Sequence, residues 1–172
     1  TKAVKQLIIR KINYKMERRI FIADRLREVF LNGRWIANTN YQEQLLNTTW
    51  EQAIFKINDL NSIAALTYHI NYYLEGLLAA FTYGKLEISD KYSFDFPPIQ
   101  SKADWDTLVD RFLKNAKLFC DCIASFDENL FDQPFIDKKY GSYLRNIEAV
   151  IEHSYYHLGQ ISLIKKLILQ SE

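Results

Sequence analysis

The sequence predicts an all-α protein built from four long helices. Apolar residues recur at intervals of three and four over long stretches, which is the spacing of one face of a helix. Only 5 glycines and 3 prolines occur among 172 residues, so few positions favour turns. The helices are expected over about residues 4–31, 62–83, 102–126 and 142–169.

The first helix is expected to run from Val4 to Leu31 and to end at Asn32-Gly33, a pair that commonly terminates helices. Its apolar stripe is expected to comprise Ile12, Met16, Ile20, Ala23, Leu26 and Phe30.

Two short helices are expected next, at Tyr41–Leu46 and Trp50–Ile57. Thr48 or Thr49 precedes the second of them, and either hydroxyl could cap it. Thr48 and Glu51 have the spacing of a capping box.

The second long helix is expected to open near Asn61 or Ser62 and to end at Tyr83, before Gly84. The following stretch, 85–100, contains Pro97-Pro98 and has no helical period. It is therefore expected to be a long crossover between helices 2 and 3, strapped over the bundle, which lets both helices run in the same direction.

The third long helix is expected from Lys102 to Phe126, with Ser101 as its cap. An irregular connection over residues 127–141 precedes the last helix. The apolar stripe of the third helix is expected to comprise Trp105, Leu108, Phe112, Leu118 or Phe119, and Cys122. That of the last helix comprises Ile147, Val150, Ile151, Leu158, Ile161, Ile164, Leu167 and Ile168. Residues 1–172 are expected to form a single domain, because a chain of this length can bury a sufficient core.

Composition excludes some classes of partner. The 22 basic and 21 acidic residues leave a net charge of +1, so no overall field attracts nucleic acid or anionic lipid. No apolar run approaches the roughly 18 residues that a membrane span needs. Cys120 and Cys122 lie two residues apart on a predicted helix and point in divergent directions, which disfavours a disulfide. We expect a cytoplasmic protein with reduced thiols.

The chain has three histidines, and their placement is suggestive of a metal site. His153 and His157 lie four residues apart on the last helix, about 40° apart on one face. His69 lies in the middle of the second long helix. Asn146 and Gln160 fall within about 20° of His153 around its helix, so that face is polar enough to line a cavity.

Two segments resemble a known family. They are Asn61-Ser-Ile-Ala-Ala-Leu-Thr-Tyr-His69 and Ile151-Glu-His153-Ser-Tyr-Tyr-His157-Leu-Gly-Gln160-Ile161. With the helix count and the crossover, they resemble a bacterial branch of the DinB/YfiT superfamily of metal-dependent enzymes. The resemblance implies a DinB-like four-helix bundle in which His69, His153 and His157 bind a divalent metal ion, with homodimers common.

Three neutral imidazoles leave an open coordination position, as catalytic zinc sites do. The resemblance implies zinc or nickel, while an all-imidazole shell leaves iron, cobalt and manganese open. Such an ion would activate water or a small thiol. Ser154 stands where a HExxH peptidase carries its glutamate, so a thermolysin-like mechanism is disfavoured.

Other residues are weaker candidates for the site. Asn146 and Gln160 could support a ligand or contact a substrate, or could make ordinary hydrogen bonds between helices. Tyr72 and Tyr73 flank the His69 face, and one of them could reach the cavity. Trp35, in a loop, could cover the mouth of the bundle or act as a hydrophobic plug.

Three hypotheses follow. The first is a metal-dependent enzyme of hydrolase or thiol transferase type that acts on a small molecule. The second is a non-catalytic metal-binding or stress-associated interaction protein. The third is a plain helical bundle with incidental histidines.

Overall fold

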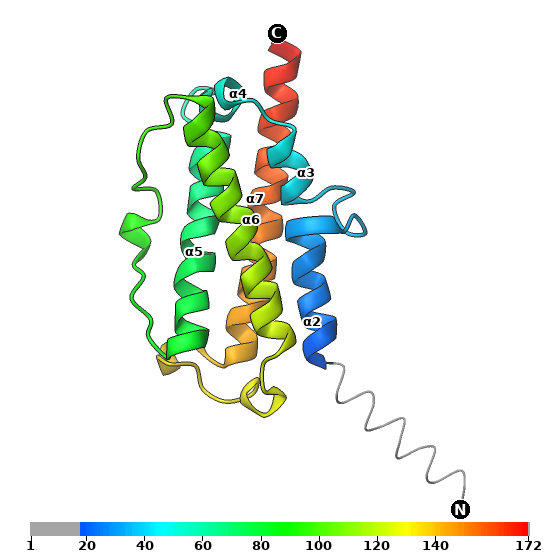
Figure 1. The fold of residues 1–172 in the computed structure, drawn as a ribbon, viewed down its shortest axis with the longest axis vertical. Coiled ribbons are helices and arrows are strands. Elements are labelled where there is room, and N and C mark those ends of the chain that lie inside the picture. The colour runs from blue at the N-terminus through cyan, green and yellow to red at the C-terminus, as the bar shows by residue number, and fades with distance from the viewer. Residues whose placement is uncertain (1–17, 172) are drawn as a thin grey trace, which may run out of the picture.

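The computed structural model describes residues 18–171, and its fold is an all-α bundle (Figure 1). The helix α6 packs against α2 and α5, and α5 packs against α7. Short helices α3 and α4 lie between α2 and α5 in sequence. The bounds are α2 Arg18–Arg27, α3 Tyr41–Leu46, α4 Trp50–Ile54, α5 Ile63–Tyr83, α6 Lys102–Ala124 and α7 Tyr143–Ser171. The predicted fold class is confirmed.

The first predicted helix is described only in part, because residues 4–17, with Ile12 and Met16, lie outside the described residues. The α2 helix continues as a π-helical turn, Glu28–Asn32, and ends there as predicted. Gly33 follows this turn in an extended conformation, with φ −96°, so the helix ends without a residue in the left-handed conformation. Ala23, Leu26 and Phe30 are buried as expected, whereas Ile20 is 40% exposed. The buried face is centred on Ile22, Ala23 and Leu26, which leaves Ile20 at its edge.

The α3 helix has the predicted bounds, and its Tyr41 connects it to α7. Tyr41 is fully buried and its hydroxyl donates a hydrogen bond to the Ser154 carbonyl, at 2.9 Å. The predicted capping box of the next helix is wrong by one residue. Thr49 and Gln52 cap each other's backbone N–H groups, and α4 ends at Ile54 rather than residue 57.

Both predicted ends of α5 are confirmed. Ser62 Oγ accepts a hydrogen bond from the Ala65 N–H, at 3.2 Å, and satisfies one of the free donors of the first turn. Gly84 has φ 69°, a left-handed conformation that glycine adopts without strain, and so closes the helix.

The connection between α5 and α6, residues 85–100, is called the strap below. It returns along α5, since its residues meet α5 in reverse order (Figure 1). Ile88 lies against Gly76, Asp90 accepts a hydrogen bond from Tyr73, and Phe96 stacks on Tyr68. A short 3-10 turn, Asp90–Tyr92, forms its centre.

The α6 helix begins at the predicted cap, where Ser101 Oγ accepts from the Asp104 N–H. Trp105, Leu108, Phe112 and Phe119 are buried, whereas Leu118 is exposed. Cys120 rather than Cys122 lies in the core, because Cys120 follows the buried Ala116 by four residues and so lies on the same face of the helix. Both thiols are unpaired.

The second irregular connection contains 3-10 turns at Glu128–Leu130 and Lys138–Tyr140. The predicted apolar residues of α7 are buried, except Leu167, which is 37% exposed near the end of the helix. Among the described residues, no helix is both long and apolar enough to cross a membrane.

Candidate metal centre

The three histidines meet between α5 and α7. His69 lies in the middle of α5, while His153 and His157 lie one turn apart on α7. The Nε2 atom of His153 is 3.2 Å from Nε2 of His69 and 2.8 Å from Nε2 of His157. His69 and His157 are each 7% exposed, and His153 is half-buried. The three Nε2 atoms therefore converge on one partly enclosed point.

This arrangement fits a shared metal ion. Two imidazole nitrogens bound to one zinc at about 2.0–2.1 Å and a tetrahedral angle lie about 3.3 Å apart. The separation of 3.2 Å between His69 and His153 is of that size, and that of 2.8 Å is somewhat shorter. The ligand nitrogens of all three histidines lie within 4.8 Å of one another, so adjustment of the side chains would bring all three lone pairs onto one ion.

Gln160 fixes the orientation and protonation of His157. Its side-chain Oε1 lies 2.6 Å from His157 Nδ1. Because an amide oxygen can only accept, Nδ1 carries the hydrogen, and Nε2 presents its lone pair to the other histidines. A hydrogen on His153 Nε2 could form a hydrogen bond with His69 or with His157, but not with both. A cation could accept a lone pair from all three Nε2 atoms. The donor set therefore fits a divalent metal ion.

Burial keeps these imidazoles neutral. Burial, followed by the neighbouring His157 and His153, lowers the pKa of His69 to about 4. The backbone of Ser93 opposes this shift, although His69 Nδ1 makes no hydrogen bond of ordinary geometry with the described residues. Burial is also the main reason why the pKa values of His153 and His157 are lowered. Neutral imidazole is the form that binds metals.

Two aromatic rings enclose the histidines. The Phe94 ring stacks on His69, with 4.2 Å between centroids and 13° between planes. Tyr73 meets His69 and His153 edge-on, with centroids 5.0 and 5.4 Å away. These rings cover part of the imidazole surface, although the Phe94 side chain itself is 41% exposed.

A cavity of about 240 Å³ opens beside His153. Residues of α5, the strap, the 127–141 connection and α7 line it, and most of these side chains are apolar. A reactive group at the histidines could therefore act on a small molecule held in the cavity.

The other predicted residues lie in different surroundings. Tyr73 and Asn146 line the cavity, but the Asn146 amide donates to the carbonyls of Tyr140 and Ser142 and so fixes the start of α7. Tyr72 bonds the backbone of Ser89 and thus holds the strap.

The interpretation of Trp35 as a plug is wrong. Its side chain is 90% exposed at a surface turn, because the chain leaves Gly33 in an extended conformation and carries the indole away from the core. The solvated indole covers no part of the bundle.

Sequence reasoning missed Asp90 and Phe94. Both lie on the strap, which carries no motif and is predicted from the sequence only as a connection. The available signal in the sequence is the aromatic content of this connection, at Tyr92, Phe94 and Phe96, because large rings favour contact with other residues. Phe96 packs against the core and Phe94 stacks on His69, although Tyr92 and Phe94 stay 48% and 41% exposed.

Residues 37–161 match the DinB superfamily, and this range includes all three histidines. The match covers most of the chain. Comparison with curated proteins and with solved structures gave no match. A helical bundle with a three-histidine cluster between two of its helices defines the class of the protein, and the chain belongs to the DinB superfamily.

Proposed function

We propose that the protein is a metal-dependent enzyme in which His69, His153 and His157 hold a divalent transition metal ion, zinc or nickel. The observation that carries this proposal is the convergence of three Nε2 atoms from two helices beside an apolar cavity. With three protein ligands, a coordination position stays open for a small molecule, as in catalytic zinc sites.

Each residue has a defined part in this proposal. The histidines hold the ion, and Gln160 orients His157 toward it. Phe94 and Tyr73 cover part of the imidazole surface, and the cavity next to His153 binds the substrate. A metal ion bound there would lower the pKa of a bound water or thiol and supply a nucleophile near neutral pH. We therefore propose hydrolase or thiol transferase chemistry.

The experiment compares metal-free protein with the same protein reloaded with zinc or nickel. Turnover of activated esters, and of electrophiles in the presence of small thiols, is expected only after reloading. His153→Ala is expected to stay inactive while it keeps its helical circular dichroism, because the core holds the bundle without the ion. Equal turnover in metal-free protein would contradict the proposal.

A non-catalytic metal-binding protein is the alternative. It would be favoured by a closed ligand shell or by the lack of space for a substrate. The cavity beside His153 therefore supports the enzyme.

Two cysteines without a disulfide support a cytoplasmic location within this proposal.

A further inference from the structure

The residues that line the cavity beside His153 indicate the size, polarity and charge of its ligand. Its volume of about 240 Å³ is below the roughly 300–1,000 Å³ of sites for drug-sized molecules, so the ligand is small. The walls are formed mainly by apolar side chains such as Ile70, Leu74, Leu77 and Val150. A ligand that fills this space must therefore have a mainly apolar body.

Among residues 18–171, Asp90 is the only carboxylate that lines the cavity, and none of the lining residues is Lys or Arg. It lies on the strap with an exposed side chain, and its Oδ1 accepts a hydrogen bond from the Tyr73 hydroxyl, at 2.8 Å. This bond holds the carboxylate at the cavity. A negative charge in that place attracts a cationic group and repels an anionic one.

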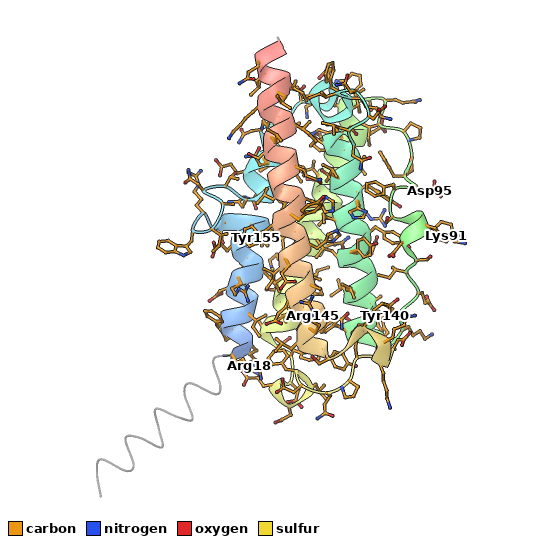
Figure 2. All side chains as sticks on the ribbon, turned by 180° about the vertical axis from the view of Figure 1, so that it is seen from behind. Arg18, Lys91, Asp95, Tyr140, Arg145 and Tyr155 are labelled. Carbon is orange, nitrogen blue, oxygen red and sulfur yellow. The ribbon has the colours of Figure 1, made fainter. Side chains whose placement is uncertain are left out.

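Of the lysines close to the cavity in sequence, Lys91 and Lys139 are directed elsewhere. Lys91 Nζ lies over the Tyr92 ring, 4.5 Å from its centroid, and Figure 2 shows Lys91 on the outer side of the strap. Lys139 pairs with Asp137 and lies over the Tyr140 ring. Neither ammonium group forms an ion pair with Asp90 within the described part of the chain.

Of two tyrosines at the cavity, Tyr73 adds to the preference for a cation, whereas the Tyr140 ring already has the Lys139 ammonium over it. Tyr73 and Tyr140 both line the cavity, and Figure 2 shows Tyr140 beside the lower part of α5. Aromatic faces attract ammonium groups, and a carboxylate with aromatic rings is a common setting for such groups.

We propose that the cavity binds a small, mainly apolar primary amine, whose ammonium group pairs with Asp90 while its apolar body lies between α5 and α7. This inference rests on the proposed function, because it names the class of molecule that would be presented to the histidines.

The test uses three probes of similar size: 2-phenylethylamine, 2-phenylethanol and 3-phenylpropionate. Binding to chelator-treated protein is measured by calorimetry at pH 7.5, so that coordination to a metal contributes to none of the three. The amine is expected to bind at least about tenfold more tightly than the carboxylate, with the alcohol between them. Equal or tighter binding of the carboxylate, or no binding of any probe at millimolar concentration, would overturn the inference.

Two strap variants separate the role of Asp90 from a general effect of charge. Asp90→Asn keeps an oxygen for the Tyr73 hydroxyl and removes the charge, so the advantage of the amine over the alcohol is expected to disappear. Asp95→Asn removes a charge from the same strap at a residue outside the cavity lining (Figure 2) and is expected to leave that advantage unchanged. Equal effects of the two variants would overturn the inference.

A second pair of variants locates the binding. Ala149→Trp fills the cavity and is expected to abolish binding of the amine and the alcohol, whereas Ala103→Trp, at an exposed position on α6, is expected to have no effect. Binding that survives in a folded Ala149→Trp protein would overturn the inference. The strap variants replace exposed side chains and decide the question even if Ala149→Trp fails to fold.

Metal content of the same preparations separates this inference from the proposed function. Asp90→Asn leaves the histidines intact and is expected to bind metal as the parent does. A protein that binds metal without selecting the amine would overturn this inference alone. A protein that selects the amine without binding metal would overturn the proposed function alone.

Discussion

The ring of Phe94 lies parallel to the imidazole of His69, with 13° between the planes and 4.2 Å between the centroids. Phe94 comes from the strap and His69 from the middle of α5, so this contact joins the connection to the centre of the bundle. The stacked ring contributes to the burial that keeps His69 neutral.

Phe94→Ala is therefore expected to raise the pKa of His69 from about 4 toward its ordinary value, by about one unit or more, because water then reaches the imidazole. Titration of the histidine side chains by nuclear magnetic resonance in metal-free protein measures this change. Phe21→Ala removes a ring from the exposed face of α2 and is the control. An unchanged His69 pKa in Phe94→Ala would contradict the role assigned to the stacking.

Gly76 provides the space in which Ile88 holds the strap against α5. A Cβ atom added at Gly76 would lie 2.1 Å from Ile88 Cγ2, so Gly76→Ala must displace the Ile88 side chain or the strap that carries it. We expect a loss of about 1–3 kcal/mol in the free energy of unfolding, measured in urea.

Gly159→Ala is the matched control, because a Cβ atom there meets nothing within 4 Å. It is expected to raise the free energy of unfolding by about 0.5–1 kcal/mol through its better helix propensity. Equal effects of the two substitutions would show that the strap is not seated on Gly76.

Gln160 is expected to tune the affinity for the metal without binding it. Gln160→Leu removes the acceptor from His157 Nδ1 and frees the imidazole to rotate, which typically weakens metal binding about 10–100-fold. Competition with a chromophoric chelator measures the change. Gln170→Leu, at an exposed position on the same helix, should retain the parent affinity.

The stability of metal-free protein is expected to depend on pH through the histidines. Their pKa values are lowered in the folded state, to about 4 for His69, from about 6.5 in the unfolded chain. Between these values the unfolded state binds more protons, so stability is fully present above about pH 6.5 and falls as the pH drops toward 4.

Urea unfolding at half-unit steps of pH, with parent and His69→Gln, measures this dependence. Glutamine does not titrate in this range, so the variant is expected to show a shallower loss of stability. Carboxylates contribute equally to both proteins. Parallel curves would contradict the account of His69.

The elements of the fold that the sequence predicted well depend on local chemistry. Ser62, Gly84 and Ser101 mark helix ends because their own side chains or backbone conformations satisfy the adjacent groups. The predicted capping box lies one residue too early, because Thr48 and Thr49 are both followed by a suitable partner three residues later. The structure resolves this tie, since Thr48 is buried and its hydroxyl donates to the Gln44 carbonyl, at 2.7 Å.

The site was predictable to a similar extent. The pair His153 and His157 is visible from its helical spacing, and His69 was the only other imidazole available. The positions of Asp90 and Phe94 depend on the path of the strap along α5, which is set by tertiary contacts such as that between Ile88 and Gly76. No spacing in the sequence reports such contacts.

The most direct test of the metal centre is elemental analysis of untagged protein purified without chelators, beside His69→Ala and the control Phe21→Ala. The parent and the control are expected to contain about one equivalent of zinc or nickel, and His69→Ala to contain little while it keeps its helical circular dichroism. No transition metal in the parent, even after incubation with zinc and nickel, or equal metal content in His69→Ala, would contradict a centre built from these three histidines.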